Sequence, residues 1–256
     1  MGIINGKCRL CGKDNADLLE SHIIPEFLYK SIYDAKHRFI DFTEDPKTGV
    51  RFAQKGVREN LLCSNCELLL SKYEKCLSDF FFELNTNSNN SIISLSSEFR
   101  YVKKIKYTEI KVALLSILFR MAVSKLSQFD GYSLGPYENV FRDIILNNKY
   151  TDRYTFSIHI SPVSINKCYY PDLIMTYEKV SKYKNIYNFQ CFIINGYLIE
   201  IMLSKVPTND IFHLFDLREK GKIIMRDIDI SMVNIKQTLL NRYKDNDVLD
   251  LIKKLK

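Results

Sequence analysis

Four cysteines form two pairs with the spacing of a metal site. Two residues separate Cys8 from Cys11, and two separate Cys63 from Cys66. Two such pairs can give four thiolates to one tetrahedral zinc ion. An ion with four sulfur ligands has no open position for water, so we expect a structural zinc that holds two distant segments together.

The other three cysteines, Cys76, Cys168 and Cys191, are scattered and bring the total to an odd seven. A reducing compartment with zinc explains this pattern better than a disulfide framework does. A reducing compartment implies a cytoplasmic protein. The alternative is that the paired cysteines are redox-active, which predicts that the purified protein lacks zinc.

A histidine lies between the two cysteine pairs, in the segment Ser21-His22-Ile23-Ile24-Pro25. At the end of a short strand, His22 could act as the base of a metal-assisted hydrolysis. In an extended segment, Glu20 and His22 project to the same side and Ser21 to the other. The alternative is a hydrogen-bonded histidine of the core.

Oxygen ligands surround this segment in the sequence. Glu59 and Asn60 precede the second cysteine pair, and Glu67, Ser71 and Glu74 share one face of the helix that we expect to begin there. Magnesium prefers such ligands. The same glutamates could equally form a solvated helix face.

These motifs occur in an order that resembles a known family. The order is Cys8-x-x-Cys11, His22-Ile-Ile-Pro25 and Asn60-Leu-Leu-Cys63-x-x-Cys66-Glu67. It is similar to that of the HNH endonucleases of the ββα-metal class, specifically those braced by a four-cysteine zinc. The resemblance covers the first third of the chain.

The resemblance implies a role for each matching residue. His22 would be the general base that activates water, Asn60 would orient the histidine or its loop, and Glu67 would bind a catalytic Mg²⁺ or Mn²⁺. The family usually has Asp, Glu or His directly before the base, whereas this chain has Ser21. Glu20, one residue earlier, is therefore the second candidate ligand.

The sequence predicts an α+β fold in two parts. Residues 1–84 would form a zinc-braced HNH-like ββα-metal module, with a strand over 18–24, a helix from Pro25 through Tyr33, a short strand over 50–53 and a helix from Glu67. Residues 85–98 are rich in Asn and Ser and read as a polar linker or excursion. Residues 99–256 would form a larger α+β domain.

Within this second part, apolar periodicity predicts helices over 109–129, 136–147 and 234–256, the second beginning at Pro136. Alternation predicts an antiparallel sheet from strands over 154–160, 189–194, 197–203, 212–217 and 223–230, with a hairpin turn at Asn195-Gly196. Lysines and aromatic residues alternate over 177–189. Such a pattern can bind nucleic acid, but lysines on an exposed hairpin explain it better.

Charge divides unevenly between the two parts. Residues 1–98 carry 12 basic and 14 acidic residues, and residues 99–256 carry 25 and 16. A basic second part favours a polyanionic partner such as double-stranded DNA. The longest apolar run, over 112–123, is interrupted by Ser116 and Arg120 and is too short to span a bilayer, and no signal peptide is found, so we expect no membrane association.

Two functions follow as hypotheses. The first is a metal-dependent DNA endonuclease, with restriction or anti-phage defence under a regulatory protein partner as a role suggested by analogy alone. The second is a catalytically degenerate, zinc-braced module that binds nucleic acid or protein. The choice between DNA and RNA, the cleavage pattern and the oligomeric state stay open at this point.

Overall fold

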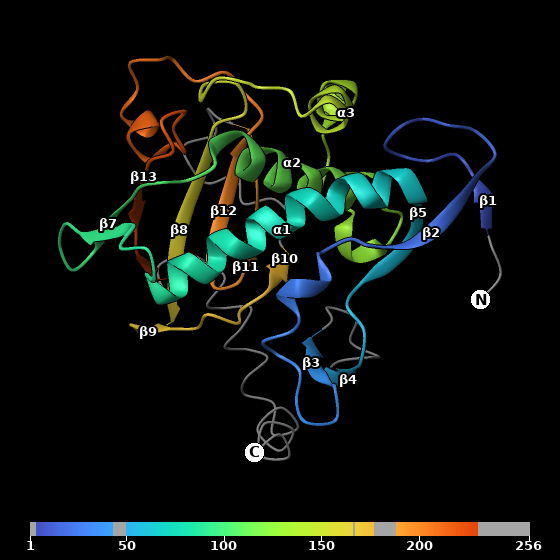
Figure 1. The fold of residues 1–256 in the computed structure, drawn as a ribbon, viewed down its shortest axis with the longest axis horizontal. Helices are drawn as coiled ribbons and strands as arrows, with labels where there is room; N and C mark the ends of the chain where they lie inside the picture. Colours follow the sequence, from blue (N-terminus) through green and yellow to red (C-terminus); the bar gives the residue numbers. More distant parts are fainter. Residues whose placement is uncertain (1–3, 43–49, 166, 177–187, 230–256) are drawn as a thin grey trace.

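The computed structural model describes residues 4–42, 50–165, 167–176 and 188–229. The described chain is α+β, as predicted, with helices and several mainly antiparallel sheets (Figure 1). The α-helices are α1 (Ser64–Thr86), α2 (Tyr107–Val123) and α3 (Glu138–Asn147). Within the described ranges, no helix combines the length and the apolar character needed to cross a membrane.

The N-terminal sheet carries the first cysteine pair and His22. It consists of β1 (Ile4–Gly6), β2 (Ala16–His22) and β5 (Arg58–Cys63), in that order and antiparallel. His22 lies opposite Arg58, and Glu20 lies opposite Asn60. Because opposite residues share a face of a sheet, this register decides which side chains surround His22.

The predicted helix after Pro25 is wrong. Only a single 3-10 turn, η1 (Glu26–Leu28), follows the proline. The chain then turns again, because the Asp34 carboxylate accepts the backbone N–H groups of Lys36 and Arg38 at 2.9 and 2.8 Å. Such local bonds compete with helical ones. The predicted strand over 50–53 is confirmed as β4 (Val50–Ala53), which pairs with β3 (Phe39–Phe42).

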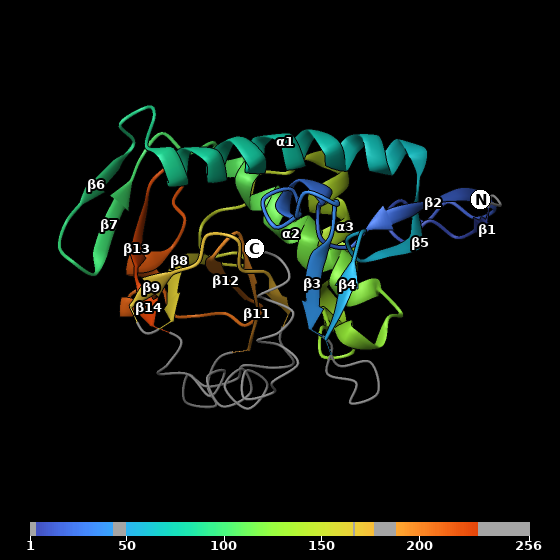
Figure 2. The ribbon, with the colours of Figure 1, turned by 90° about the horizontal axis from the view of Figure 1, so that it is seen from below.

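Helix α1 starts directly at the second cysteine pair and runs along the molecule. The N-terminal sheet lies at its start, and the hairpin of β6 (Ile92–Ser94) and β7 (Phe99–Val102) lies at its end (Figures 1 and 2). Its buried residues, Cys66, Leu70, Tyr73, Leu77, Phe80, Phe81 and Leu84, recur every three or four positions, as predicted. Asn87, in a left-handed conformation with φ 50°, ends the helix.

Helix α2 packs against both α1 and α3. It is buried on all sides and ends at Val123, before the predicted end at residue 129, because a separate 3-10 turn, η2 (Ser127–Phe129), follows. Pro136 lies in another 3-10 turn, η3 (Gly135–Tyr137), which leads into α3. A helix that is apolar on nearly all sides is expected to be buried at the centre of a protein. Polar residues within α2, among them Arg120, are therefore buried with it.

The larger sheet has the order β10-β11-β12-β8-β14, with β9 also paired to β8. Its strands are β8 (Ile158–Ile165), β9 (Cys168–Tyr169), β10 (Met175–Thr176), β11 (Phe189–Ile194), β12 (Tyr197–Met202) and β14 (Ile228–Asp229). All pairs are antiparallel except β14 with β8. The predicted hairpin is confirmed, with Asn195 and Gly196 at φ 52° and 75°.

Three strand predictions in this part differ from the structure. The strand predicted over 154–160 begins only at Ile158 and extends to Ile165, as β8. Residues 212–217 form a 3-10 helix, η4 (Ile211–Phe215), because the Asp210 side chain caps it at Phe212 N. The segment 223–230 contains two strands, β13 (Ile223–Arg226) and β14, in different sheets. The predicted helix over 234–256 lies outside the described residues, as does the lysine and aromatic pattern up to residue 187.

One hydrophobic core crosses the expected boundary between the two parts. Its members extend from Cys8 and Leu10 through α1 and α2 to Ile223 and Met225. Residues 85–98 contain the end of α1 and strand β6. The division at residues 84 and 98 stays a prediction, and the two parts share their largest apolar cluster.

Candidate metal centre and hydrolytic site

The four cysteines meet as predicted. Their Sγ atoms all lie within 4.8 Å of one another, with 3.7 Å between Cys8 and Cys66 and 3.8 Å between Cys11 and Cys63. A tetrahedral ion with Zn–S bonds of about 2.3 Å requires sulfur atoms about 3.8 Å apart. The cluster therefore fits a metal ion with four thiolate ligands.

Backbone geometry brings the two cysteine pairs together. The turn holding Cys8 and Cys11 closes through Gly12, whose φ of +76° suits glycine, and Arg9 N donates to Leu61 O on β5 at 3.1 Å. Cys63 ends β5, and its N–H donates to the Cys8 sulfur at 3.4 Å. The hydrogen bond with Cys66 and the backbone of Cys63 lower the pKa of Cys8, whereas the same contact and burial raise the pKa of Cys66. The pair therefore favours one thiolate, and a bound metal ion would favour the others.

His22 is the last residue of β2, as predicted, and its side chain is 24% exposed. Its Nε2 lies 2.7 Å from Glu26 Oε2, a carboxylate that η1 brings back toward the strand. Burial and the charge of Arg58 lower the pKa of His22, whereas Glu26 opposes them. The ring is therefore neutral near pH 7 and able to accept a proton.

The outer face of the sheet places charged groups beside the ring. Arg58 lies opposite His22, with its guanidinium 3.5 Å from Glu20 Oε2 and 3.7 Å from Glu26 Oε2. Glu20 thus lies on the His22 side, as the alternation predicted. The Asn60 amide donates to Leu18 O at 3.4 Å, so it contacts the backbone of β2 four residues before His22.

Ser21, on the inner face of the sheet, lies close to Glu67 in the first turn of α1. Ser21 is 1% exposed and accepts the Leu62 N–H at 3.1 Å. Burial raises the pKa of Glu67, while a hydrogen bond with Ser21 and the charge of Arg120 oppose the increase. Glu67 Oε1 is buried without a hydrogen-bond partner. The two positions that the family resemblance links to metal binding therefore interact, but one of them is a hydroxyl.

A buried arginine of α2 ties the backbone of His22 to α1. Arg120 Nη1 donates to His22 O and to Glu74 Oε1, both at 2.8 Å, and the side chain is 1% exposed. Glu74 is therefore engaged by Arg120. Glu59 is engaged elsewhere, because it accepts Ser124 Oγ at 2.6 Å and Lys125 N at 3.1 Å at the end of α2.

These contacts do not form a ready site for a catalytic divalent cation. Glu20 and Glu26 contact Arg58, Glu74 contacts Arg120, and Glu67 lies close to Ser21 at the other face. In the part of the chain that the structure describes, the four cysteines are the only group of three or more His, Cys, Asp or Glu side chains close enough to share an ion. The donor set beside His22 does not fit a bound Mg²⁺ or Mn²⁺.

Sequence reasoning missed three residues of this site: Glu26, Arg58 and Arg120. Arg120 left a signal, because it is a charge inside an otherwise apolar helix. Arg58 and Glu26 left none, because their roles depend on the register of β2 with β5 and on the turn after Pro25.

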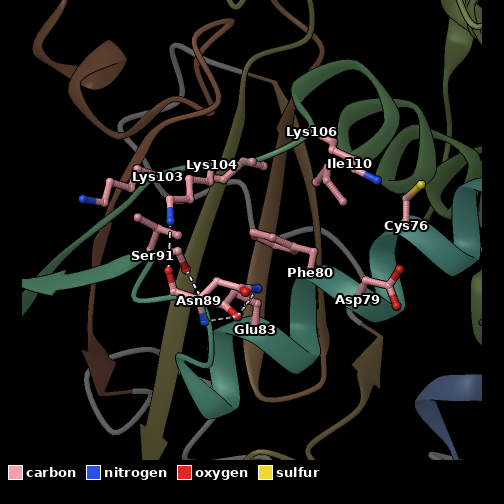
Figure 3. Close-up of a pocket in the computed structure, with 12 residues that line it drawn as sticks. Cys76, Asp79, Phe80, Glu83, Asn89, Ser91, Lys103, Lys104, Lys106 and Ile110 are labelled. Carbon is pink, nitrogen blue, oxygen red and sulfur yellow. Dashed lines mark hydrogen bonds between the residues drawn. The ribbon is translucent and has the colours of Figure 1, made fainter.

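A cavity of about 180 Å³ lies elsewhere, between the end of α1 and the segment leading into α2 (Figure 3). Its Glu83 carboxylate accepts Ser91 Oγ at 2.6 Å and Ser88 Oγ at 2.7 Å, and these bonds lower the pKa of Glu83 to about 2. Lys104 Nζ donates to Asn89 O at 3.0 Å. These bonds within the lining fix the turn after α1, and the cavity shares no residue with the His22 site.

The chain was also compared with known proteins. No protein-family model, no curated protein and no solved structure matches it.

Proposed function

We propose that this protein is a nuclease that hydrolyses DNA phosphodiester bonds with His22 as its general base, braced by a structural zinc at the four cysteines. The observation that carries the proposal is a neutral, partly exposed imidazole between a carboxylate and an arginine, on a strand pair whose other end carries a cysteine of the four-cysteine cluster. A base with these properties is suited to deprotonating water at neutral pH.

Each group in the proposed site has a chemical task. Glu26, beside Nε2, favours the tautomer that carries its proton there, which leaves Nδ1 to take a proton from water. The resulting hydroxide oxygen forms a bond to phosphorus, and the bond from phosphorus to the leaving sugar oxygen breaks. The leaving oxygen then takes a proton from solvent. Arg120 holds the carbonyl of His22 and so fixes the end of β2.

Zinc is the metal that this proposal assigns to the cysteines. Four thiolates saturate the ion, so it contributes folding free energy and takes no part in the hydrolysis. Among the residues that the structure describes, no group of three or more His, Cys, Asp or Glu side chains beside His22 could hold the catalytic Mg²⁺ that the family resemblance implies, and no step of the proposed reaction depends on it.

The test is nicking of supercoiled plasmid by the zinc-loaded protein. We expect His22→Ala to lower the rate by about 100-fold or more, because general-base catalysis contributes a factor of about 10² to 10⁴. Its zinc content and melting temperature should stay unchanged. His37→Asn is the matched control, because His37 is exposed and asparagine tolerates its φ of 56°.

The alternative is a binding module without catalysis. Ser21 before the base and the pairing of the surrounding carboxylates favour it. It predicts DNA binding by the wild type without cleavage, whether Mg²⁺, Mn²⁺ or no divalent cation is added. Cleavage by His22→Ala at the wild-type rate would show instead that another residue is the base.

A further inference from the structure

The outer face of the N-terminal sheet has a feature that goes beyond a general base. Resting on the hydrolysis proposed for His22, we propose that the Arg58 guanidinium binds the substrate phosphate and supplies the positive charge that a divalent cation supplies in other nucleases. The ligand is thus a phosphodiester held between Arg58 and the His22 imidazole.

The register of the sheet sets the distance between the two groups. Arg58 begins β5 directly opposite His22 at the end of β2. Opposite residues of an antiparallel pair have Cβ atoms about 4.5 to 5.5 Å apart and point to the same face. A phosphate bound by the guanidinium would therefore lie beside the base, where a nucleophilic water must be activated.

The ion pairs of Arg58 are longer than those of two other arginines, Arg38 and Arg51. The contacts of Arg58 with Glu20 and Glu26 measure 3.5 and 3.7 Å. By contrast, Arg38 donates hydrogen bonds of 3.0 and 2.7 Å to Asp34. Arg51 donates hydrogen bonds of 3.0 and 2.9 Å to Asp41. The guanidinium groups of Arg38 and Arg51 are thus hydrogen-bonded to their carboxylates, whereas Arg58 has only longer ion pairs.

Donor groups of Arg58 are available for a ligand. Within the described residues its guanidinium forms no hydrogen bond, and its Nε is buried without a partner. The side chain is 24% exposed, so it reaches solvent beside an imidazole of equal exposure. A planar guanidinium with unused N–H groups matches two oxygens of a phosphate.

Two guanidinium groups lie near the imidazole, and each has carboxylate neighbours. Arg120 donates to the carbonyl of the histidine and pairs with Glu74 at 2.8 Å. Arg58 has only the longer contacts with Glu20 and Glu26, so it is the guanidinium that a phosphate can bind, by displacing these two carboxylates. As hydroxide attacks phosphorus, negative charge grows on the phosphate oxygens, and a guanidinium bound to them stabilises that charge.

The experiment uses the full-length, zinc-loaded wild type, Arg58→Met, Arg58→Lys and Arg51→Met, with plasmid cleavage measured with and without added Mg²⁺. We expect cleavage without Mg²⁺, a loss of at least about 10-fold in Arg58→Met and an intermediate rate in Arg58→Lys, which keeps the charge but loses the planar fork. Arg51→Met is the matched control, since Arg51 pairs with Asp41 on the β3–β4 hairpin, and its rate should change less than about twofold.

A second measurement does not require activity. Dimethyl phosphate should shift the ¹H–¹³C signal of the His22 ring in the wild type and in Arg51→Met, but not in Arg58→Met. Mn²⁺ binding is measured by electron paramagnetic resonance in the wild type, Glu67→Gln and Glu20→Gln. We expect no bound Mn²⁺ signal in the wild type that is lost in either variant.

The outcomes separate this inference from the proposed function. A strict requirement for Mg²⁺, Mn²⁺ binding that depends on Glu67 or Glu20, or full activity in Arg58→Met would overturn the role of Arg58 while leaving a nuclease in place. If the wild type never cleaves, the proposed function fails. In that case an Arg58-dependent dimethyl phosphate shift still supports the anion site, and its absence overturns it.

Discussion

In the proposed function, residues a few positions apart on the N-terminal sheet have different chemical tasks, metal binding for the cysteines and proton transfer in contact with solvent for His22. The cysteines must be deprotonated and close together to bind metal, and hydrogen bonding lowers the pKa of Cys8 in that direction. His22 must stay neutral and reach solvent, and burial with Arg58 lowers its pKa accordingly. The strands separate these environments, because Cys63 ends β5 while Arg58 and His22 lie at the opposite end of the β2–β5 pair.

The cysteine cluster can be tested one residue at a time. We expect Cys63→Ser to lose bound zinc and to lower the free energy of unfolding by several kcal/mol, since apparent zinc binding in small modules is worth about 10 to 16 kcal/mol. Elemental analysis and thermal unfolding measure both effects. Cys168→Ser is the control, because Cys168 is exposed on β9, outside the cluster. Full zinc content and an unchanged melting temperature in Cys63→Ser would rule out this metal centre.

At the scale of elements, a buried ionic network ties η4 to the larger sheet. His159 on β8 contacts Asp216 at 3.0 Å. It also contacts Glu200, the residue opposite it on β12, at 3.7 Å. Asp216 follows η4 and also contacts His213 at 2.7 Å. Burial disfavours the charged ring, but the hydrogen bonds and charges of Asp216 and Glu200 outweigh it and raise the pKa of His159 to about 9.

This network predicts how stability depends on pH. His159 has a higher pKa when folded, about 9, than its unfolded value of 6.5, so its protonation stabilises the fold. The contribution is complete below pH 6.5, decreases as the pH rises toward 9 and is lost above it, with a total of about 3 kcal/mol. Urea unfolding of wild type and His159→Gln at pH 6 and pH 9.5 measures this difference.

Titrating groups that do not contact His159 cancel in that comparison, because they behave alike in both proteins. The free energy lost by the substitution should therefore be larger at pH 6 than at pH 9.5. An equal loss at the two pH values would mean that the His159 ring is not charged in the folded protein.

At the scale of the whole molecule, the candidate site is assembled by both parts of the chain. Arg120 on α2 donates to the carbonyl of His22, Glu59 caps the end of α2, and Tyr73 on α1 donates to Ile145 O on α3 at 3.1 Å. The apolar face of α1 joins the same core as α2. The segment that carries the four cysteines therefore depends on helices that follow it.

This dependence predicts that residues 1–90 alone do not fold, even with zinc. The fragment would expose Leu70, Leu77 and Phe81, each at most 2% exposed in the whole chain, at a cost of about 2 kcal/mol per side chain. Circular dichroism and the dispersion of amide NMR signals measure the outcome. A zinc-bound fragment with a dispersed spectrum and a cooperative unfolding transition would show that the segment is an independent domain.

The sequence by itself determined the features that depend on short-range spacing. The cysteine pairs, the strand ending at His22, helix α1 and the turn at Asn195-Gly196 follow from residues that are neighbours in the chain. Tertiary structure decided what surrounds His22. Strand register placed Arg58 opposite the imidazole, and the turn after Pro25 placed Glu26 beside it. Helix packing placed Arg120, almost one hundred residues later in the chain, at the carbonyl of His22. Local pattern specifies which face a side chain takes, but contacts between distant segments depend on how the elements pack.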